Sequence, residues 1–313
     1  MKSNHRSPSA APASDRIELM NTFVQIVEAG SLSAAATQLH TTQPTVSRRL
    51  QTLEKQLGLR LLRRSTHALK LTEDGERCYA RARELLQDWE AFEAELRGDG
   101  EPEGTLRVMV PHAFGQELLV RPLAKYLREH PRVNVDWLLN DRRPDFIGDG
   151  VDCAIHVGEV SDPGVVAIKL AEVPRIVVAA PSILPSGRPP PRHASELASL
   201  PWLALRTYYR TELRLTRERD GEQCRIPMRP RVSTDSLFAL RSGALMGLGA
   251  CVGSTWLLAD DLAAARLVQL APEWHAAPLP CYLIYPYARQ HPPRLKRFVQ
   301  EIRNGWDDSF RLK

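Results

Sequence analysis

The fold of the N-terminal region is decided by one stretch of the chain, Thr42-Gln43-Pro44-Thr45-Val46-Ser47-Arg48-Arg49-Leu50-Gln51-Thr52-Leu53-Glu54-Lys55-Gln56-Leu57-Gly58. Its apolar residues recur at helical spacing: Val46, Leu50, Leu53 and Leu57. Pro44 suits the first turn of a helix, where its missing N–H costs nothing, and Gly58 is a typical helix stop. At about 100° per residue, Arg48 lies almost opposite the apolar stripe. The stretch predicts a helix with one buried face and one polar face.

Two shorter helices are expected before it. Leu19, Phe23, Ile26 and Val27 have the spacing of an amphipathic helix. Gly30 ends that helix, and Ser33 is the expected N-cap of the next one, whose apolar face carries small alanines. A short polar turn then leads into the third helix. Two short helices, a tight turn and a polar third helix predict a helix-turn-helix.

The segment that follows, residues 59–72, alternates apolar and polar positions. It predicts two short strands on either side of a basic tip that contains Arg63, Arg64 and His67. Such a β-wing places its arginines near DNA phosphates or the minor groove. The alternative is a generic three-helix bundle with a solvated basic face.

Charge is concentrated in this region. The whole chain carries a net charge of +5. Residues 41–71 hold seven basic side chains and a single acid, Glu54, whereas residues 72–97 hold four basic and eight acidic ones. A basic block beside an acidic one indicates a focused contact with a polyanion. On the polar face of the third helix, arginine and glutamine suit guanine and adenine edges in a major groove.

Four runs carry a family resemblance: Phe23-Val24-Gln25-Ile26-Val27-Glu28-Ala29-Gly30-Ser31-Leu32-Ser33-Ala34-Ala35-Ala36, Thr42-Gln43-Pro44-Thr45-Val46-Ser47-Arg48-Arg49-Leu50, Leu53-Glu54-Lys55-Gln56-Leu57-Gly58-Leu59-Arg60-Leu61-Leu62 and Leu71-Thr72-Glu73-Asp74-Gly75. Over residues 18–76 the chain resembles the LysR-type transcriptional regulators, with Leu62 where that family usually has Phe. The resemblance implies a winged helix-turn-helix. The candidate DNA-contacting residues are Ser33, Thr42, Gln43, Pro44, Thr45, Ser47, Arg48, Arg49, Arg63, Arg64 and His67.

A long helix is expected over residues 72–97, capped by Thr72. Its large apolar residues follow a 3.5-residue period typical of a coiled-coil seam: Cys78, Ala82, Leu85, Trp89, Phe92 and Leu96. A helix packed on its own domain is the alternative. Dimerisation agrees better with a two-fold DNA site, and the LysR resemblance implies it as well. Glycines and Pro102 then predict a linker over residues 97–104.

The rest of the chain alternates strand and helix patterns. Strands are expected over 105–110, 133–139, 151–157, 176–180 and 280–287, and helices over 118–126 and 144–149. This alternation predicts a parallel α/β sheet that binds ligands at the carboxyl ends of its strands. The runs Gly104-Thr105-Leu106-Arg107-Val108, Gly150-Val151-Asp152-Cys153-Ala154-Ile155 and Gly247-Leu248-Gly249 resemble the LysR effector domain. The resemblance implies two α/β lobes like those of a periplasmic binding protein, with a ligand cleft between them.

The predicted domains are a disordered tail (1–15), a winged helix-turn-helix (16–75), the linker helix (72–97) and an effector domain (104–313). Lobe I is expected over 104–173 and 277–313, and lobe II over 174–276. Residues at strand ends are the candidate effector contacts: Pro111, His112, Phe114, Asn140, His156, Arg206, Thr234 and Asp235. The glycines of 247–253 resemble a nucleotide loop only superficially, since no strand pattern precedes them and no Lys-Ser or Lys-Thr pair follows, so a tight turn is expected.

Several other classes are disfavoured by the sequence. The longest uncharged apolar stretch, 244–259, is broken by glycines and is shorter than the roughly 20 residues of a membrane span. The polar N-terminus lacks the apolar core of a secretory signal, so a cytoplasmic protein is expected. Five scattered cysteines form no metal-ligand spacing and are interpreted as reduced thiols, a redox pair being the alternative. No catalytic motif, metal site or cofactor is expected.

These observations lead to one functional hypothesis. The chain is expected to regulate transcription by binding double-stranded promoter DNA as a dimer, and further as a tetramer, with RNA polymerase as an additional partner. A small-molecule effector in the cleft would control lobe closure and so the geometry on DNA. Two alternatives stay open: a solute-binding sensor, and an enzyme with an appended DNA-binding domain.

Overall fold

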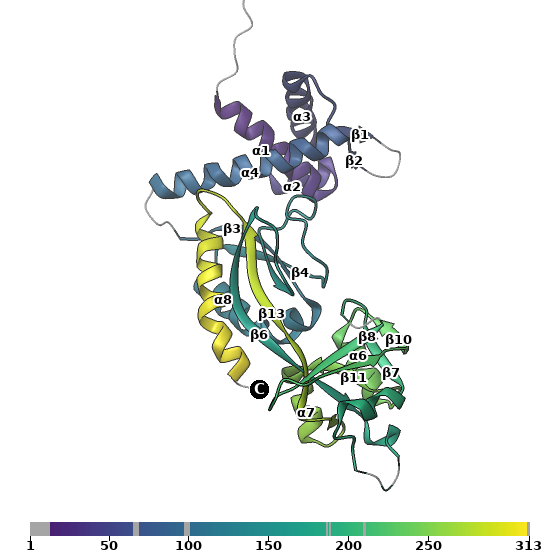
Figure 1. Cartoon of the computed structure of the whole chain (residues 1–313). Coiled ribbons are helices and arrows are strands. Elements are labelled where there is room, and N and C mark those ends of the chain that lie inside the picture. Colours follow the sequence, from purple (N-terminus) through teal and green to yellow (C-terminus); the bar gives the residue numbers. More distant parts are fainter. Residues whose placement is uncertain are drawn as a thin grey trace, which may run out of the picture. The chain divides into compact units, whose positions relative to one another are not determined.

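The computed structural model describes residues 13–64, 69–96, 101–185, 187, 189–208 and 211–311 (Figure 1). The chain divides into two compact units. One consists of residues 1–100 with the short segments 147–150 and 288–293, and the other of 101–146, 151–287 and 294–313.

The first unit is a small helical domain with a two-stranded hairpin. Its elements are α1 (Ala13–Ala29), α2 (Leu32–Gln38), α3 (Gln43–Leu57), β1 (Leu62–Arg64), β2 (Leu69–Leu71) and α4 (Glu73–Leu96). Helix α1 begins at Ala13, inside the predicted tail, while residues 1–12 lie outside the described part. Gly58 ends α3 in the left-handed conformation expected of a C-terminal glycine, with φ of 69°.

One expectation about this unit is wrong. The N-cap of α2 is Ser31, not Ser33: the Ser31 hydroxyl accepts a hydrogen bond from the Ala34 N–H at 3.1 Å. Gly30 directly before it has φ of 69°, so the chain turns there and the helix begins two residues earlier than predicted. Ser33 is an exposed residue in the first turn of α2.

The core of the first unit is formed by the predicted apolar faces. Phe23 and Ile26 of α1 and Val46 of α3 are fully buried. The stripe on α3 continues through Leu50 and Leu53, but Leu57 at its end is 46% exposed. The packing of these helices holds α3 with its polar face toward solvent.

Helix α4 has two differently packed halves. In its first half, Tyr79 and Ala82 are buried in the core of the first unit, as the own-domain alternative proposed. In its second half, large apolar residues are exposed: Leu85, Trp89, Phe92 and Leu96. Leu96 is 71% exposed. The predicted seam is therefore covered by its own domain at Cys78 and Ala82 and open beyond them.

The second unit is an α/β domain. In chain order its elements are β3 (Gly104–Val110), η1 (Phe114–Leu118, a π-helix), α5 (Val120–Glu129), β4 (Val133–Leu139), β5 (Cys153–Val157), β6 (Val165–Ala179), η2 (Pro181–Ile183), η3 (Ala194–Ser199), β7 (Trp202–Leu205), β8 (Glu212–Arg217), β9 (Gln223–Pro227), β10 (Pro230–Thr234), α6 (Leu237–Leu245), β11 (Cys251–Ser254), α7 (Thr255–Ala263), β12 (Val268–Leu270), β13 (Trp274–Pro286) and α8 (Pro293–Arg311).

The main sheet is mixed, which corrects the expectation of a parallel sheet. Its strands follow the order β11-β6-β13-β5-β3-β4. Strands β4, β3 and β5 are parallel, but β13 pairs antiparallel with both β5 and β6. The predicted strands 176–180 and 280–287 are the ends of these two much longer strands. Outside these ends many residues of the two strands are exposed or only partly buried, so the apolar runs marked only the ends.

The predicted helix over 144–149 is also wrong. This segment forms turns and bends between β4 and β5. Pro144 at its start lacks an N–H, and Gly148 and Gly150 favour turns over helix. Gly150 has φ of 63°. Residues 247–249 form the expected tight turn, because Gly247 has φ of 70° and a Cβ on Gly249 would lie 2.7 Å from the Pro201 carbonyl oxygen.

The long strands β6 and β13 run through the two largest apolar cores of the second unit. On β6, Val173 belongs to the first core and Val177 to the second. On β13, Leu283 belongs to the first and Ala276 to the second. Helix α8 runs beside β6 and β13 and contributes Phe298 to the first core (Figure 1). The exact lobe boundaries stay a prediction.

Candidate DNA-binding surface and effector cavity

The N-terminal half of α3 presents polar side chains to solvent. Gln43, Pro44 and Arg48 are exposed, and the hydroxyls of Thr42 and Thr45 lie 2.9 Å apart. The Arg48 carbonyl accepts a hydrogen bond from Thr52 Oγ1 at 2.9 Å, so the helical backbone below the guanidinium is well satisfied. Side chains of this kind at the start of an exposed helix can reach base edges in a major groove.

Arg49 lies on the flank of the same helix but has a partner inside the domain. Its guanidinium forms an ion pair with the Glu18 carboxylate of α1. The Arg49 side chain is 26% exposed. This pair fixes α3 against α1, and it leaves Arg48 as the arginine of α3 that points toward solvent.

Glu54, the single acid of the basic block, holds the connection into the hairpin. The residue is 8% exposed. Its Oε1 accepts hydrogen bonds from the N–H groups of Leu61 at 2.8 Å and Leu62 at 3.4 Å, and its Oε2 lies 3.3 Å from Arg60. A buried carboxylate with two backbone donors closes the turn between α3 and β1.

Thr72 and Gly75 fix the other end of the hairpin. The Thr72 hydroxyl donates to the Arg60 carbonyl at 2.6 Å and accepts from the Gly75 N–H at 2.9 Å, which confirms the predicted cap of α4. A Cβ on Gly75 would lie 2.0 Å from the Leu61 carbonyl oxygen. Glycine is therefore required where α4 passes the hairpin.

The hairpin itself presents basic residues in cross-strand register. Strands β1 and β2 are antiparallel, and Arg63 lies directly opposite Lys70, both of them exposed. Like charges directly opposite each other reduce the stability of a sheet, so their conjunction indicates an anionic partner. Of the other predicted wing contacts, Arg64 is in β1 with its side chain outside the described residues, and His67 also lies outside them.

A cavity in the second unit is lined by residues from eight strands or the segments next to them. Its volume is about 60 Å³. The wall contains five of the eight predicted effector contacts: Pro111, Phe114, Asn140, His156 and Asp235. Asp141, Arg142, Arg175, Tyr208 and Ser254 also line it.

Comparisons with known proteins agree with these two regions. Residues 17–76 match the family model "Bacterial regulatory helix-turn-helix protein, lysR family", and residues 99–307 match "LysR substrate binding domain". The chain is 32% identical over 292 residues to the transcriptional regulator PtxR of Pseudomonas aeruginosa, covering 93% of each chain. It is 30% identical over 298 residues to the transcriptional activator AaeR of Escherichia coli, covering 95% of this chain and 94% of AaeR.

The chain belongs to the LysR-type transcriptional regulators. Solved structures agree. The full-length Vibrio cholerae virulence activator AphB matches with a TM-score of 0.57 at 27% identity, over 91% of this chain and 98% of AphB. CrgA, a LysR-type regulator from Neisseria meningitidis, matches with a TM-score of 0.56 at 29% identity, over 93% of this chain and 98% of CrgA.

Three predicted effector contacts of this LysR-type regulator do not line the cavity. His112 contacts Asp141 instead. The ring Nδ1 of His112 lies 2.9 Å from Asp141 Oδ2, and the backbone N–H of His112 donates to Asp141 Oδ1 at 3.1 Å. Arg206 and Thr234 meet through a backbone hydrogen bond of 2.8 Å. That bond joins the ends of the parallel strands β7 and β10, so the two residues extend strand pairing.

Sequence reasoning missed the buried polar residues of the cavity wall. Arg175 of β6 is 9% exposed, and its Nε donates to the Ala277 carbonyl at 2.8 Å. Its guanidinium lies 5.5 Å from the centre of the Tyr208 ring, whose hydroxyl donates to the Val157 carbonyl at 3.0 Å. The signal was an arginine inside the apolar run of residues 173–180, since a charged residue amid buried positions requires a special partner.

Two side chains of the wall have shifted pKa values. Burial, together with the nearby Arg143 guanidinium, lowers the pKa of His156 below its usual value of 6.5. Burial raises the pKa of the Tyr208 hydroxyl. Both residues are therefore neutral near pH 7, and the buried charge of the wall comes from Arg175.

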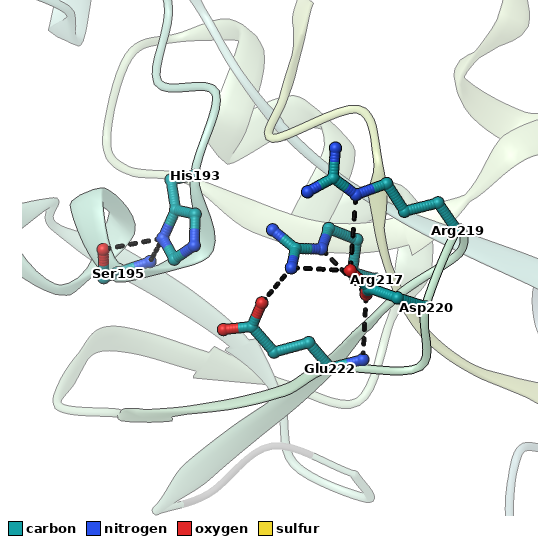
Figure 2. A network of polar contacts seen from close by, with 6 residues as sticks. All are labelled: His193, Ser195, Arg217, Arg219, Asp220 and Glu222. Atoms are coloured by element: carbon teal, nitrogen blue, oxygen red, sulfur yellow. Dashed lines mark hydrogen bonds and ion pairs between the residues drawn. The ribbon is translucent and has the colours of Figure 1, made fainter.

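A second polar cluster lies at the β8–β9 hairpin (Figure 2). Asp220 accepts hydrogen bonds from Arg217 at 2.8 and 2.9 Å, and these bonds hold the pKa of Asp220 well below its usual range. Arg217 also lies 5.2 Å from the centre of the Trp274 ring. The His193 ring accepts the Ser195 N–H at 3.2 Å and caps η3. These contacts close a hairpin and cap a turn, so the cluster is structural.

Within the described ranges, no group of three or more His, Cys, Asp or Glu could hold a metal ion. In that same part of the chain, no helix is both long enough and apolar enough to cross a bilayer. All five cysteines are free thiols, and burial raises the pKa of Cys251 to about 12.

Proposed function

We propose that this LysR-type regulator binds promoter DNA sequence-specifically as a dimer. A small molecule that binds in the cavity would change how the protein binds that DNA. The observation that carries the proposal is the exposed polar face of α3 beside the opposed cations Arg63 and Lys70 of the hairpin. Arg48 and Gln43 would contact bases, and the hairpin cations would contact phosphates.

The proposed dimer forms along the second half of α4. Trp89 and Phe92 are 41% and 46% exposed, and their ring centroids lie 5.7 Å apart, so they form one apolar patch with Leu85 and Leu96. Such a patch is costly in water and favours a partner helix. A second copy bound there brings a second α3 to the DNA, and two recognition helices read a palindromic site.

The proposed response to an effector uses the strands shared by the two cores. Because β6 and β13 pass through both cores, a ligand that touches residues of each core favours one arrangement of them over another. In this proposal the altered arrangement of the two cores changes how dimers assemble into tetramers. It also changes how the regulator contacts RNA polymerase at the promoter. The regulator works in the cytoplasm without a cofactor, and no catalytic step is part of the scheme.

DNA binding tests the proposal directly. The full chain is titrated into a labelled DNA fragment from upstream of its own gene and into a scrambled fragment of equal length, with fluorescence anisotropy as the readout. We expect the upstream fragment to bind at least about 10³-fold more tightly. Equal affinity for both fragments at physiological salt contradicts the proposal, because it leaves only phosphate binding.

A further inference from the structure

The inner wall of the effector cavity contains the start of a helix. Helix α7 has nine residues, and its N-cap Ser254 lines the cavity. The first N–H groups of an α-helix lack partners within the helix and carry partial positive charge. This part of the wall is therefore suited to a negatively charged group.

Ser254 provides a second, independent observation. The residue is 5% exposed, and its side chain does not cap α7. Across the described residues, its hydroxyl has no hydrogen-bond partner. A hydroxyl that lines the cavity and has no protein partner is available to donate a hydrogen bond to a ligand atom.

Arg175 is the cross-strand neighbour of Ser254. In the antiparallel pairing of β11 with β6, Ser254 stands opposite Arg175. Opposite residues project from the same face of a sheet, and both residues line the cavity. Within the described residues, Arg175 is the one buried cation. Its contacts with the Ala277 carbonyl and the Tyr208 ring hold the guanidinium in place.

The acidic groups of the wall lie in more exposed positions. Asp235 is exposed, and Asp141 is engaged with both the backbone and the ring of His112. His156 is neutral near pH 7 because its pKa is lowered. The buried charge of the wall is therefore positive, whereas its exposed residues carry both signs of charge.

The rest of the cavity wall is mostly apolar, and the space that it encloses is small. Phe114, Ile155, Val173, Val252 and Leu279 line it. The open space of about 60 Å³ admits a compact molecule. An apolar wall with a few convergent polar groups is typical of a site for a small organic ligand.

We propose that the effector is a small monocarboxylate, whose carboxylate lies between the Arg175 guanidinium, the Ser254 hydroxyl and the first turn of α7. Its apolar body packs against Phe114 and Val252. This inference rests on the proposed function of the cavity as the effector site. A carboxylate there accepts charge-assisted hydrogen bonds from several donors at once, and these are stronger than bonds between neutral groups.

Calorimetric titration of the full chain at constant ionic strength tests the inference. The probes are propionate and benzoate, each compared with its uncharged amide, and inorganic phosphate. We expect at least one carboxylate to bind at least about tenfold more tightly than its amide, the factor expected when a charged hydrogen bond is lost. Equal binding of acid and amide overturns the inference, as does phosphate binding as tight as that of the carboxylates.

Two variants locate the binding. Arg175→Gln and Ser254→Ala should each weaken binding of that carboxylate about tenfold or more and leave amide binding unchanged. Arg214→Gln and Ser242→Ala are matched controls on exposed positions of β8 and α6, and they should bind as the wild type does. Circular dichroism checks folding, and Ser254→Ala keeps the test decisive if Arg175→Gln is unstable. Unchanged carboxylate affinity in folded Ser254→Ala overturns the inference.

The anisotropy assay separates this inference from the proposed function. A protein that prefers its upstream DNA but binds no carboxylate overturns the inference alone. A protein that binds a carboxylate through Arg175 and Ser254 but shows no preference for that DNA supports the inference and contradicts the proposed function.

Discussion

The DNA-binding surface and the effector cavity hold their cations in opposite surroundings. Arg48 and Arg63 are exposed, whereas Arg175 is 9% exposed. Exposed cations attract a long polyanion from a distance, and salt weakens that attraction strongly. A buried cation is screened far less and suits one small anion. In the proposed scheme the two regions of this regulator thus bind anions of different size.

The two regions also differ in how many copies of the chain they need. The cavity wall comes entirely from the second unit of one chain. A palindromic DNA site, by contrast, requires two α3 helices. Changes at the proposed dimer contact should therefore separate the two binding events.

The largest expected effect comes from Trp89→Ala combined with Phe92→Ala. Removing both rings strips the apolar patch of α4, and truncating a large aromatic at a buried contact costs roughly 3–5 kcal/mol. We expect a monomer that does not bind its upstream DNA at nanomolar protein, while binding in the cavity is unchanged. Analytical ultracentrifugation measures the shift.

Tyr287→Ala is the control for that double variant, since Tyr287 is 76% exposed and lies in the other half of the sequence. It should remain a dimer. A Trp89→Ala, Phe92→Ala protein that dimerises as tightly as the wild type would show that α4 does not join the copies.

Gly75→Ala should have the next largest effect. Its Cβ would lie 2.0 Å from the Leu61 carbonyl oxygen, so the hairpin or α4 must move. Overpacking of this kind costs up to about 3 kcal/mol. We expect a lower melting temperature for the first unit and weaker binding to all DNA. Gly164→Ala, which meets only the end of the Asp162 side chain, should change neither.

Arg48→Ala tests base reading by α3. We expect a loss of about 1–3 kcal/mol on the upstream DNA and a relaxed preference at one base pair in each half-site. Selection of binding sites from a randomised pool measures that preference. Arg49→Ala is the comparison, because its ion pair with Glu18 predicts a loss of stability and no change in preference. Equal losses on specific and random DNA would make Arg48 a phosphate contact.

Arg63→Ala tests whether DNA binding depends more strongly on salt than carboxylate binding does. Removing one phosphate contact should lower the slope of log K against log salt by about one unit for DNA. The same variant should leave carboxylate binding and its shallow salt dependence unchanged. A DNA slope equal to that of the wild type would exclude Arg63 from the interface.

His156→Gln has the smallest expected effect. The pKa of His156 is lowered in the folded protein, so the unfolded chain binds its proton more readily. Stability is therefore lost as pH falls through the usual value of 6.5 toward the lower folded value. We expect the melting temperature of the wild type to fall more than that of His156→Gln between about pH 7.5 and 5.5. Parallel pH curves would remove His156 as the cause.

The helix-turn-helix could be predicted well because its determinants are local. The stripe of α3, the Gly58 stop and the Thr72 cap each depend on residues a few positions apart. The Ser31 cap was missed because Ser31 and Ser33 are both good caps, and the left-handed turn at Gly30 decides between them. A local pattern fails where two local choices are equivalent.

The cavity could be predicted only in part. The expected strand ends led to Phe114, Asn140 and His156, which line the cavity, because parallel strands bring their carboxyl ends together. Arg175 and Ser254 become neighbours only through the pairing of β6 with β11, which are far apart in the sequence. Long-range antiparallel register of this kind leaves no periodic trace in the sequence.

Hydroxyl-radical footprinting of the full chain on DNA from upstream of its own gene tests the central claim most directly, namely that two copies of α3 read a two-fold site. We expect two protected half-sites on one face of the duplex, about 10 base pairs or a multiple of that apart. We also expect Trp89→Ala with Phe92→Ala to remove both protections together. A single protected half-site that persists in the double variant would contradict the claim.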